Sequence, residues 1–276
     1  MSEQSATAPP RLRTVFCTCG GLFGALVLRR LRASDRLEIC GIIRSVRVLD
    51  PRFGFLRGAL AQIHRSGVAY ALYLWCTTTL TDWLCALAGI GAVPMRAATA
   101  GIPLLTTRDI NDAEGLRFLK TCAPDLLISA FFNQRVHAAA LALPKYGCLN
   151  IHPSLLPDAK GVDPVFQCLL HGEPALGVTV HFMTPDFDAG QILAQRALDG
   201  GAGSSVFATT ALLFREGAGL LAATIESIVR GASGAPQTSA GSYQSWPTRP
   251  ELRDFWARGG ALLRVGDLTR LLSFKE

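Results

Sequence analysis

Short apolar runs alternate with longer helical patterns along most of the chain. The first run, "RTVFCTCG", ends in a glycine turn and leads into a helical pattern that closes with arginines. Connections between neighbouring parallel strands are almost always right-handed crossovers that hold a helix. The alternation therefore predicts an α/β fold with a mostly parallel sheet. Later strands are expected in "RLEICGIIRS", "IPLL", "PDLLISAFF" and "YGCLNI", with helices at about 111–121 and 134–141.

The second half of the chain predicts how the sheet ends. "GVTVHFM" and "GQILAQRAL" are separated only by a loop, which is typical of two paired strands at the far side of the sheet. An alanine-rich helix is expected from about Ser205 to Arg230, and a glycine, serine and proline linker follows it. We divide the chain into a flexible leader (1–12), a main domain (13–230) and a linker with a short C-terminal tail (231–276).

Residues 51–94 do not fit the plain alternation, and we expect them to form an apolar helical insertion. From Gly67 to Val93 the only charge is Asp82, so a membrane span is a real alternative. Four threonines and Asp82 in the middle of the segment disfavour insertion into lipid. The favoured interpretation is a helical hairpin that covers the sheet or pairs with another subunit, which leaves a homodimer open.

Net charge and cysteine content indicate the cellular compartment of the protein but do not identify its function. The net charge of +6 suits an anionic substrate, a nucleic acid or an anionic membrane surface equally well. The eight cysteines include no pair of C-x-x-C motifs, so we expect reduced thiols and no metal site. The first residues, "MSEQSATAPPRLR", lack the apolar core of a secretion signal. These features favour the cytoplasm.

The glycine turn "GGLFG" at 20–24 resembles a dinucleotide fingerprint but lacks the spacing of the full motif. A nicotinamide cofactor is therefore a weak interpretation. Backbone N–H groups at the start of a helix do attract anions. We therefore expect Gly20 and Gly21 to contact an anionic group of a substrate.

A polar pair stands at the end of the strand "YGCLNI". Side chains alternate along a strand, so Asn150 and His152 project to one side while Ile151 enters the core. Open α/β sheets bind ligands at the carboxyl ends of their parallel strands. Pro153 keeps His152 extended, which presents the pair at this edge.

The chemistry of this pair suits an acyl-type reaction. An asparagine amide and a histidine can both donate hydrogen bonds to an oxyanion that forms at a carbonyl carbon. Asp188, in the loop "PDFDAGQI", can keep His152 protonated and accept protons from an attacking amine. An isolated Asn-x-His is more often structural, so the spacing alone does not establish catalysis.

The segment from Leu149 to Gln195, "LNIHPSLLPDAKGVDPVFQCLLHGEPALGVTVHFMTPDFDAGQILAQ", resembles the signature of the folate-dependent formyltransferases. That signature joins N-x-H, S-L-L-P, a glycine, G-V-T-x-H and D-x-G in this order. Weaker similarity covers roughly Arg13 to Ile228.

The resemblance implies a Rossmann-like domain that uses 10-formyltetrahydrofolate in one-carbon metabolism. Asn150, His152 and Asp188 would be the catalytic trio. The folate would lie against two short segments, and Ser154 would join the two glycines in contacting substrate. The implied folate-binding residues are Phe131, Phe132, Asn133, Gln134, Asp186 and Phe187.

The resemblance also shapes the expected acceptor. The region after Ile228 is too short for the β-barrel domain of members that formylate initiator tRNA, which argues against tRNA and favours a small-molecule amine. Two alternatives stay open. The protein is a formyltetrahydrofolate hydrolase if water replaces the amine, or a non-catalytic membrane-associated or scaffolding protein with the same fold.

Overall fold

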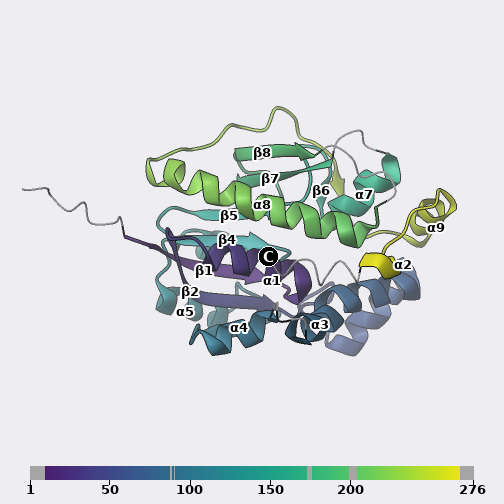
Figure 1. Ribbon diagram of the computed structural model, residues 1–276, viewed down its shortest axis with the longest axis horizontal. Helices are drawn as coiled ribbons and strands as arrows, with labels where there is room; N and C mark the ends of the chain where they lie inside the picture. Colours follow the sequence, from purple (N-terminus) through teal and green to yellow (C-terminus); the bar gives the residue numbers. More distant parts are fainter. Residues whose placement is uncertain (1–9, 88, 90, 173–175, 199–203, 268–276) are drawn as a thin grey trace, which may run out of the picture.

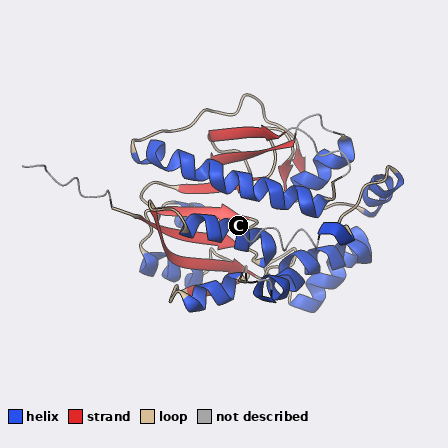
Figure 2. Cartoon of the chain, in the orientation of Figure 1, coloured by secondary structure: helices blue, strands red, loops and turns tan. Residues whose placement is uncertain are grey.

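The computed structural model describes residues 10–267 apart from 88, 90, 173–175 and 199–203 (Figures 1 and 2). Residues 1–9 of the expected leader and 268–276 of the expected tail lie outside the described residues. A seven-stranded sheet has the order β3-β2-β1-β4-β5-β7-β8. Its first five strands are parallel, and β7 alone runs in the opposite direction, pairing antiparallel with both β5 and β8, which confirms the predicted mostly parallel α/β fold. The strands are β1 (Leu12–Thr18), β2 (Leu37–Ser45), β3 (Leu104–Thr107), β4 (Leu126–Ala130), β5 (Cys148–His152), β7 (Leu176–Phe182) and β8 (Ile192–Leu198), while β6 (Lys160–Gly161) pairs with β9 (Tyr243–Gln244).

Helices cover both faces of the sheet. One buried cluster joins α1 and α8 to the sheet, and a second joins α5 and α6 to its other face. The helices are α1 (Gly21–Arg32), α2 (Phe55–Trp75), α3 (Thr81–Leu87), α4 (Val93–Thr99), α5 (Ala113–Cys122), α6 (Ala138–Leu141), α7 (Pro164–His171), α8 (Val206–Val229) and α9 (Arg249–Ala257), and the π-helical turn η1 (Cys76–Leu80) joins α2 to α3.

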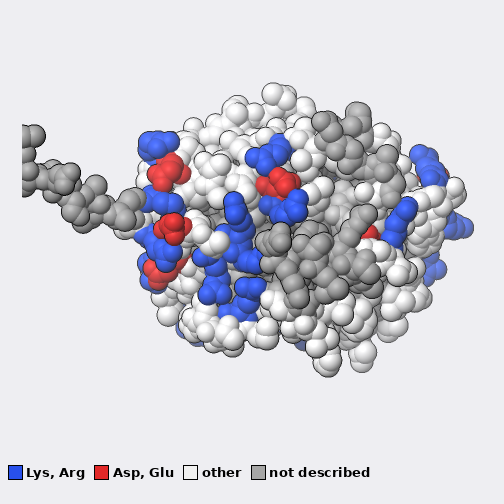
Figure 3. Space-filling model, in the orientation of Figure 1, with Lys and Arg blue, Asp and Glu red and all other residues white. Residues whose placement is uncertain are grey.

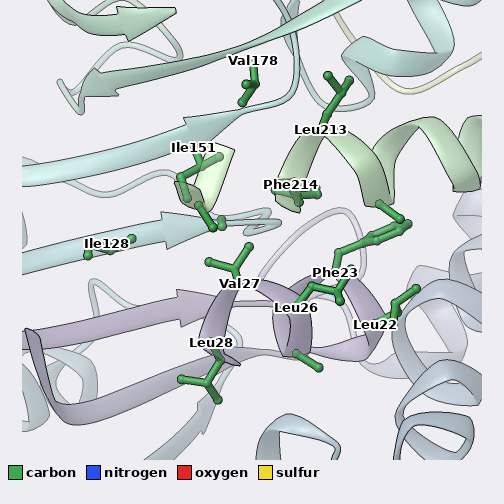
Figure 4. Packing of buried hydrophobic residues seen from close by; sticks show 14 of the residues in the cluster. Leu22, Phe23, Leu26, Val27, Leu28, Ile128, Ile151, Val178, Leu213 and Phe214 are labelled. Atoms are coloured by element: carbon green, nitrogen blue, oxygen red, sulfur yellow. The ribbon is translucent and has the colours of Figure 1, made fainter. Parts of the chain in front are cut away.

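An aromatic cluster fixes α1 against α8 at the carboxyl end of the sheet (Figure 4). The ring of Phe23 on α1 lies 4.9 Å from that of Phe131 and 5.8 Å from that of Phe214 on α8. At Gly217, a Cβ atom would stand only 2.4 Å from Ile151 of β5. The absent side chain therefore lets α8 pack directly on β5, the strand that carries the polar pair.

The helix expected at 134–141 is shorter in the structure, where α6 begins only at Ala138. Gln134, the expected first residue of this helix, bonds to other segments instead. Its buried side chain accepts a hydrogen bond from Ile110 N at 2.6 Å and donates one to Ser45 Oγ at 2.7 Å. The chain from Asn133 to His137 therefore forms neither helix nor strand after β4, and it lines a cavity.

The insertion at 51–94 is helical, as expected, and lies beside the carboxyl ends of the parallel strands (Figure 1). Gly67 has φ 84° and ψ 169°, so it breaks α2 into two rods. Within the described residues, α8 is the one helix long and apolar enough to cross a membrane, and 61% of its most apolar window is buried in the protein. Among the described residues of the insertion, no helix meets that criterion.

The C-terminal tail folds back and joins the insertion to the main domain. Ser66 Oγ donates to Pro247 O at 2.5 Å, and Arg249 Nη2 donates to Ile63 O at 2.9 Å. The ring of Phe255 on α9 lies 5.0 Å from Phe166 on α7. The tail therefore braces the first rod of α2 and the start of α7 at the same time.

Candidate functional site

A cavity of about 620 Å³ opens at the carboxyl ends of the parallel strands. This is the edge where open α/β sheets bind ligands. Segments from four regions meet there: the strand ends, the loop before β8, the insertion and the tail. The polar side chains predicted from the sequence lie among them.

The structure brings Asn150, His152 and Asp188 together. Asp188 Oδ1 lies 3.5 Å from both Asn150 Nδ2 and His152 Nδ1. The other carboxylate oxygen of Asp188 accepts from Gly161 N at 2.9 Å. His152 Nε2 lies 3.0 Å from Ala159 O. Both ring nitrogens of His152 thus face oxygen acceptors, which is the arrangement that a protonated imidazole requires.

Close backbone approach positions Asp188. Its own φ is 51°, and a Cβ atom on the neighbouring Gly190 would lie 1.8 Å from Phe182 O. The side chain of Gln237 donates to both Asp188 O and Gly190 O, at 2.7 and 2.9 Å. The D-x-G sequence and a residue of the tail therefore hold the carboxylate in place.

His181 completes the group, although the sequence analysis gave it no role. Its Nε2 lies 3.2 Å from Asn150 Nδ2, and its Nδ1 lies 2.8 Å from Phe182 O. A carbonyl oxygen only accepts, so the proton sits on Nδ1 and Nε2 accepts from the amide of Asn150. Burial lowers the pKa of His181 to about 4, against the opposing effect of Asp188. The G-V-T-x-H part of the family signature was the available signal for His181.

The expected folate-binding segments form one half of the cavity. Phe131, with φ 51°, and Asn133 follow β4, and Asn133 is fixed by Ser45 Oγ at 2.6 Å. Two further residues contribute here that the sequence analysis did not select. Arg135 pairs with Asp186 at 2.8 Å and also lies over the ring of Phe187. Tyr243 of the tail lies 6.0 Å from the same ring.

The other half of the cavity lies opposite the expected folate-binding segments and is formed by the insertion, α7 and the tail. Tyr70 of α2 is completely buried and donates its hydroxyl to Asp163 Oδ2 at 2.7 Å. The ring of Trp246 stands 6.4 Å from that of Tyr70. Leu74 and Trp75 continue this wall. The insertion therefore contributes directly to the site, which its apolar composition did not reveal.

The three residues expected to contact substrate have other partners. Gly21 N donates to Asp82 Oδ1 at 2.9 Å, so a carboxylate of the chain itself already meets the glycine turn. Ser154 is buried and its hydroxyl lies 3.2 Å from Ala159 O. Gly20, Gly21 and Ser154 are also not among the described residues that line the cavity. In the structure these three positions shape the surrounding backbone, and their contact with substrate stays a prediction.

Part of the chain is similar to known proteins. The family model for formyl transferase matches residues 86–209. The methionyl-tRNA formyltransferase of Thermotoga neapolitana is 41% identical over 107 residues, which are 39% of this chain and 34% of that protein. The chain matches between about a third and a half of the length of such curated relatives.

Solved structures show the same fold at lower identity. Glycinamide ribonucleotide transformylase 1 from Symbiobacterium toebii has a TM-score of 0.57 and 19% identity, covering 86% of this chain and 99% of that chain. A sugar 3N-formyl transferase, determined in the presence of dTDP and 5-N-formyl-THF, has a TM-score of 0.53 and 14% identity. That match covers 86% of this chain and 70% of the other.

One expectation is wrong. The short region after Ile228 led us to expect no tRNA partner, yet curated proteins that the chain matches are methionyl-tRNA formyltransferases. The length of chain after Ile228 does not determine which amine reaches the strand-end cavity. The motif and the family model point to the same family. Residues 86–209, which carry Asn150, His152 and Asp188, match the formyl transferase family model.

Proposed function

We propose that the protein transfers a formyl group from 10-formyltetrahydrofolate to an amine. The observation that carries the proposal is the convergence of Asn150, His152 and Asp188 within 3.5 Å at the ligand-binding edge of the domain. Donors of this kind stabilise an oxyanion only when they are fixed before the reaction begins. His152 and Asp188 meet that requirement through contacts with backbone atoms, and Asn150 meets it through the side chains of His181 and Asp188.

The roles follow from the positions of the donors. The amine nitrogen attacks the formyl carbon, and the carbonyl oxygen becomes an oxyanion that Asn150 Nδ2 and protonated His152 stabilise. Asp188 accepts the proton that the attacking amine loses. That proton then passes to N10 of the folate as the carbon–nitrogen bond breaks, so tetrahydrofolate leaves with the formyl amide as the second product.

Asn150 is held ready for this step by His181. Neutral His181 accepts one amide hydrogen of Asn150 at 3.2 Å, while the contact of Asn150 with Asp188 is longer, at 3.5 Å. The second amide hydrogen is therefore the one available to the oxyanion. We assign His181 as a positioning residue, because it acts on the reaction through Asn150.

The donor would occupy the half of the cavity around Phe131, Phe132, Asn133, Gln134, Asp186 and Phe187. Residues 131–137 after β4 line the cavity outside any helix or strand, where their peptide groups would be the partners of a pterin ring. Arg135 ties Asp186 to this wall, so the loop and the strand end form a continuous surface. We place the reaction in the cytoplasm, because all eight cysteines are free thiols.

The first experiment uses 10-formyltetrahydrofolate with an isotopic formyl carbon. The protein is incubated with methionyl-tRNA in one reaction and with a panel of small amines in another, and the products are identified by mass spectrometry. Label in an amide supports the proposal and names the acceptor class. Label that appears only as formate supports the hydrolase alternative, and label that stays on the folate contradicts both.

A further inference from the structure

The exposed side of the insertion is apolar from the second rod of α2 through η1 to α3. Exposed side chains recur there every three or four residues, a spacing that places them on one face of a helix. Thr79 is the polar member of this row, and Trp83 and Leu87 are its most exposed members, at 74% and 80%. We call the row the outer stripe, and it consists of Val68, Leu72, Trp75, Thr79, Trp83 and Leu87.

The buried side of the same segment is the more polar one. Thr77, Thr81 and Asp82 are all buried, and the last two accept hydrogen bonds from the first backbone amides of α1. A surface helix of a globular protein normally has the reverse arrangement, with its polar face in water. Contiguous apolar surface that stays exposed marks a place where another molecule covers the protein. The charges around the outer stripe indicate which kind of molecule this is.

Cationic side chains stand at both ends of the outer stripe. Near α3, burial lowers the pKa of Arg96 on α4, and the charges of Arg29 and Arg32 on α1 lower it further. Helix α1 packs against both α3 and α4. Figure 3 shows the blue cluster over α1 and α4 beside a largely white surface over α3. At the other end of the outer stripe, the first rod of α2 carries the exposed Arg57 and Arg65.

Acidic side chains do not balance these cations within the insertion. Asp82 is the only acidic residue in the sequence from 51 to 99, and it is buried against Arg44. Two copies that paired through the outer stripe would bring cationic ends together, because a two-fold interface uses the same surface of both subunits. A nucleic acid needs cations along its contact with the protein, whereas the outer stripe itself is uncharged. An anionic membrane fits both features, since its acyl region accepts apolar side chains and its headgroups attract arginine.

We infer that the outer stripe docks the protein on the surface of an anionic lipid membrane. Trp75, Trp83 and Leu87 enter the boundary between headgroups and acyl chains, a region in which tryptophan is favoured. Arg32 and Arg57 stay at the level of the headgroups. Trp75 also lines the cavity, so the docked protein holds its cavity beside the headgroup layer. Docking involves no formyl transfer, and its test is independent of the proposed function.

Cosedimentation with lipid vesicles tests the docking. One set of vesicles is phosphatidylcholine alone, and the other holds phosphatidylcholine and phosphatidylglycerol in equal parts. We expect the wild-type protein to bind the mixed vesicles at least about tenfold more tightly than the neutral ones, because basic residues add to binding at an anionic surface. Added salt should weaken this binding. Equal binding to the two sets, or binding to neither, overturns the inference.

A double variant removes the apolar contribution of the outer stripe. Trp83→Gln with Leu87→Gln changes side chains that are mostly exposed and are not among the described residues that line the cavity. We expect this variant to bind the mixed vesicles at least about tenfold more weakly than the wild-type protein, since less apolar surface enters the membrane. Trp256→Gln with Val265→Gln is the matched control, because both side chains are exposed and lie outside the insertion. Equal binding by the two double variants overturns the inference.

A single variant tests the cationic contribution. Arg32→Gln should weaken binding to the mixed vesicles by about fivefold, the contribution of one basic residue near an anionic surface. Arg117→Gln is the matched control, because it is exposed on α5 at the other face of the sheet, and it should bind as the wild-type protein does. Equal loss in both variants contradicts docking through this face.

Light scattering without lipid checks the alternative of a second copy. We expect the wild-type protein and the Trp83→Gln, Leu87→Gln variant to have the same molar mass. A wild-type dimer that this variant converts to a monomer would assign the outer stripe to a second copy of the chain and would overturn the inference.

Discussion

Asn150 donates its side-chain amide to His181, and the two nitrogen atoms lie 3.2 Å apart. His181 can only accept in this contact, because its ring proton is on Nδ1, which donates to Phe182 O at 2.8 Å. The amide of Asn150 therefore cannot rotate freely about its last bond. A donor whose direction is fixed in advance contributes more to oxyanion stabilisation than one that must be ordered during the reaction.

Replacing His181 should reduce turnover more than it affects binding. The variant His181→Ala removes the acceptor that fixes Asn150, and we expect kcat to fall by about 10²-fold, the cost of a small misplacement at a reacting centre. The KM for the folate should change little. His181→Gln offers an acceptor oxygen and should recover part of the rate. Equal losses in kcat and binding, measured by steady-state kinetics and folate titration, would contradict a positioning role.

The buried state of His181 predicts a loss of stability in mild acid. Its pKa is lowered from 6.5 to about 4, so between these values the unfolded chain binds more protons than the folded one. The free energy of unfolding should then rise with pH across this window and fall as the solution is acidified, by up to about 3 kcal/mol. Urea unfolding at pH 5 and pH 7 measures the difference. It should be clearly smaller in His181→Gln than in the wild-type protein.

His152 and Asp188 should each be required for transfer. We expect His152→Ala to lower kcat by about 10²- to 10³-fold because an oxyanion donor is lost. Asp188→Asn should lower it by about 10²-fold or more, since the amine proton has no acceptor. Binding of folate, followed by fluorescence titration, should persist in both. His171→Ala and Asp35→Asn, two exposed positions, are the matched controls, and normal turnover in a site variant would remove that residue from the mechanism.

The hydrogen bond between Tyr70 and Asp163 should contribute to stability. The variant Tyr70→Phe leaves a buried carboxylate oxygen without its donor, which costs about 1–3 kcal/mol in the free energy of unfolding. Urea denaturation measures this cost, with Tyr243→Phe as the control at a position that is 52% exposed. Adding Asp163→Asn to Tyr70→Phe should cost less than the sum of the two single changes. Strict additivity would show that the two groups do not interact.

The docking of the C-terminal tail on the main domain should depend on one aromatic contact, between Phe255 and Phe166. Phe255 is 3% exposed and packs against Phe166, so Phe255→Ala creates a cavity that costs about 3–5 kcal/mol locally. We expect α9 to detach before the sheet unfolds, which makes residues near 245–257 sensitive to limited proteolysis. Trp256→Ala, at a side chain that is 42% exposed, should leave the pattern unchanged. Identical digestion of both variants would show that the tail is held by other contacts.

The sheet was predictable because its signals are local. Apolar runs, glycine turns and the two-residue alternation of Asn150 and His152 depend on neighbours in sequence, and the strand ends follow from them. Contacts between distant segments left no such signal. Asp82 reaches Gly21 across 61 positions, and Tyr70 reaches Asp163 across 93. An apolar stretch with one charge gave no information on where that charge would be placed.

The break at Gly67 divides the work of α2 between its two rods. Ser66, before the break, bonds to the tail, whereas Tyr70 and Leu74, after it, line the cavity, which Gln62 of the first rod also reaches. The second rod continues through η1 to Thr81 and Asp82, which bond to the first backbone amides of α1. An exchange of residues 68–82 for protein engineering therefore has to keep Thr81 and Asp82, because the same segment that lines the cavity also holds the start of α1.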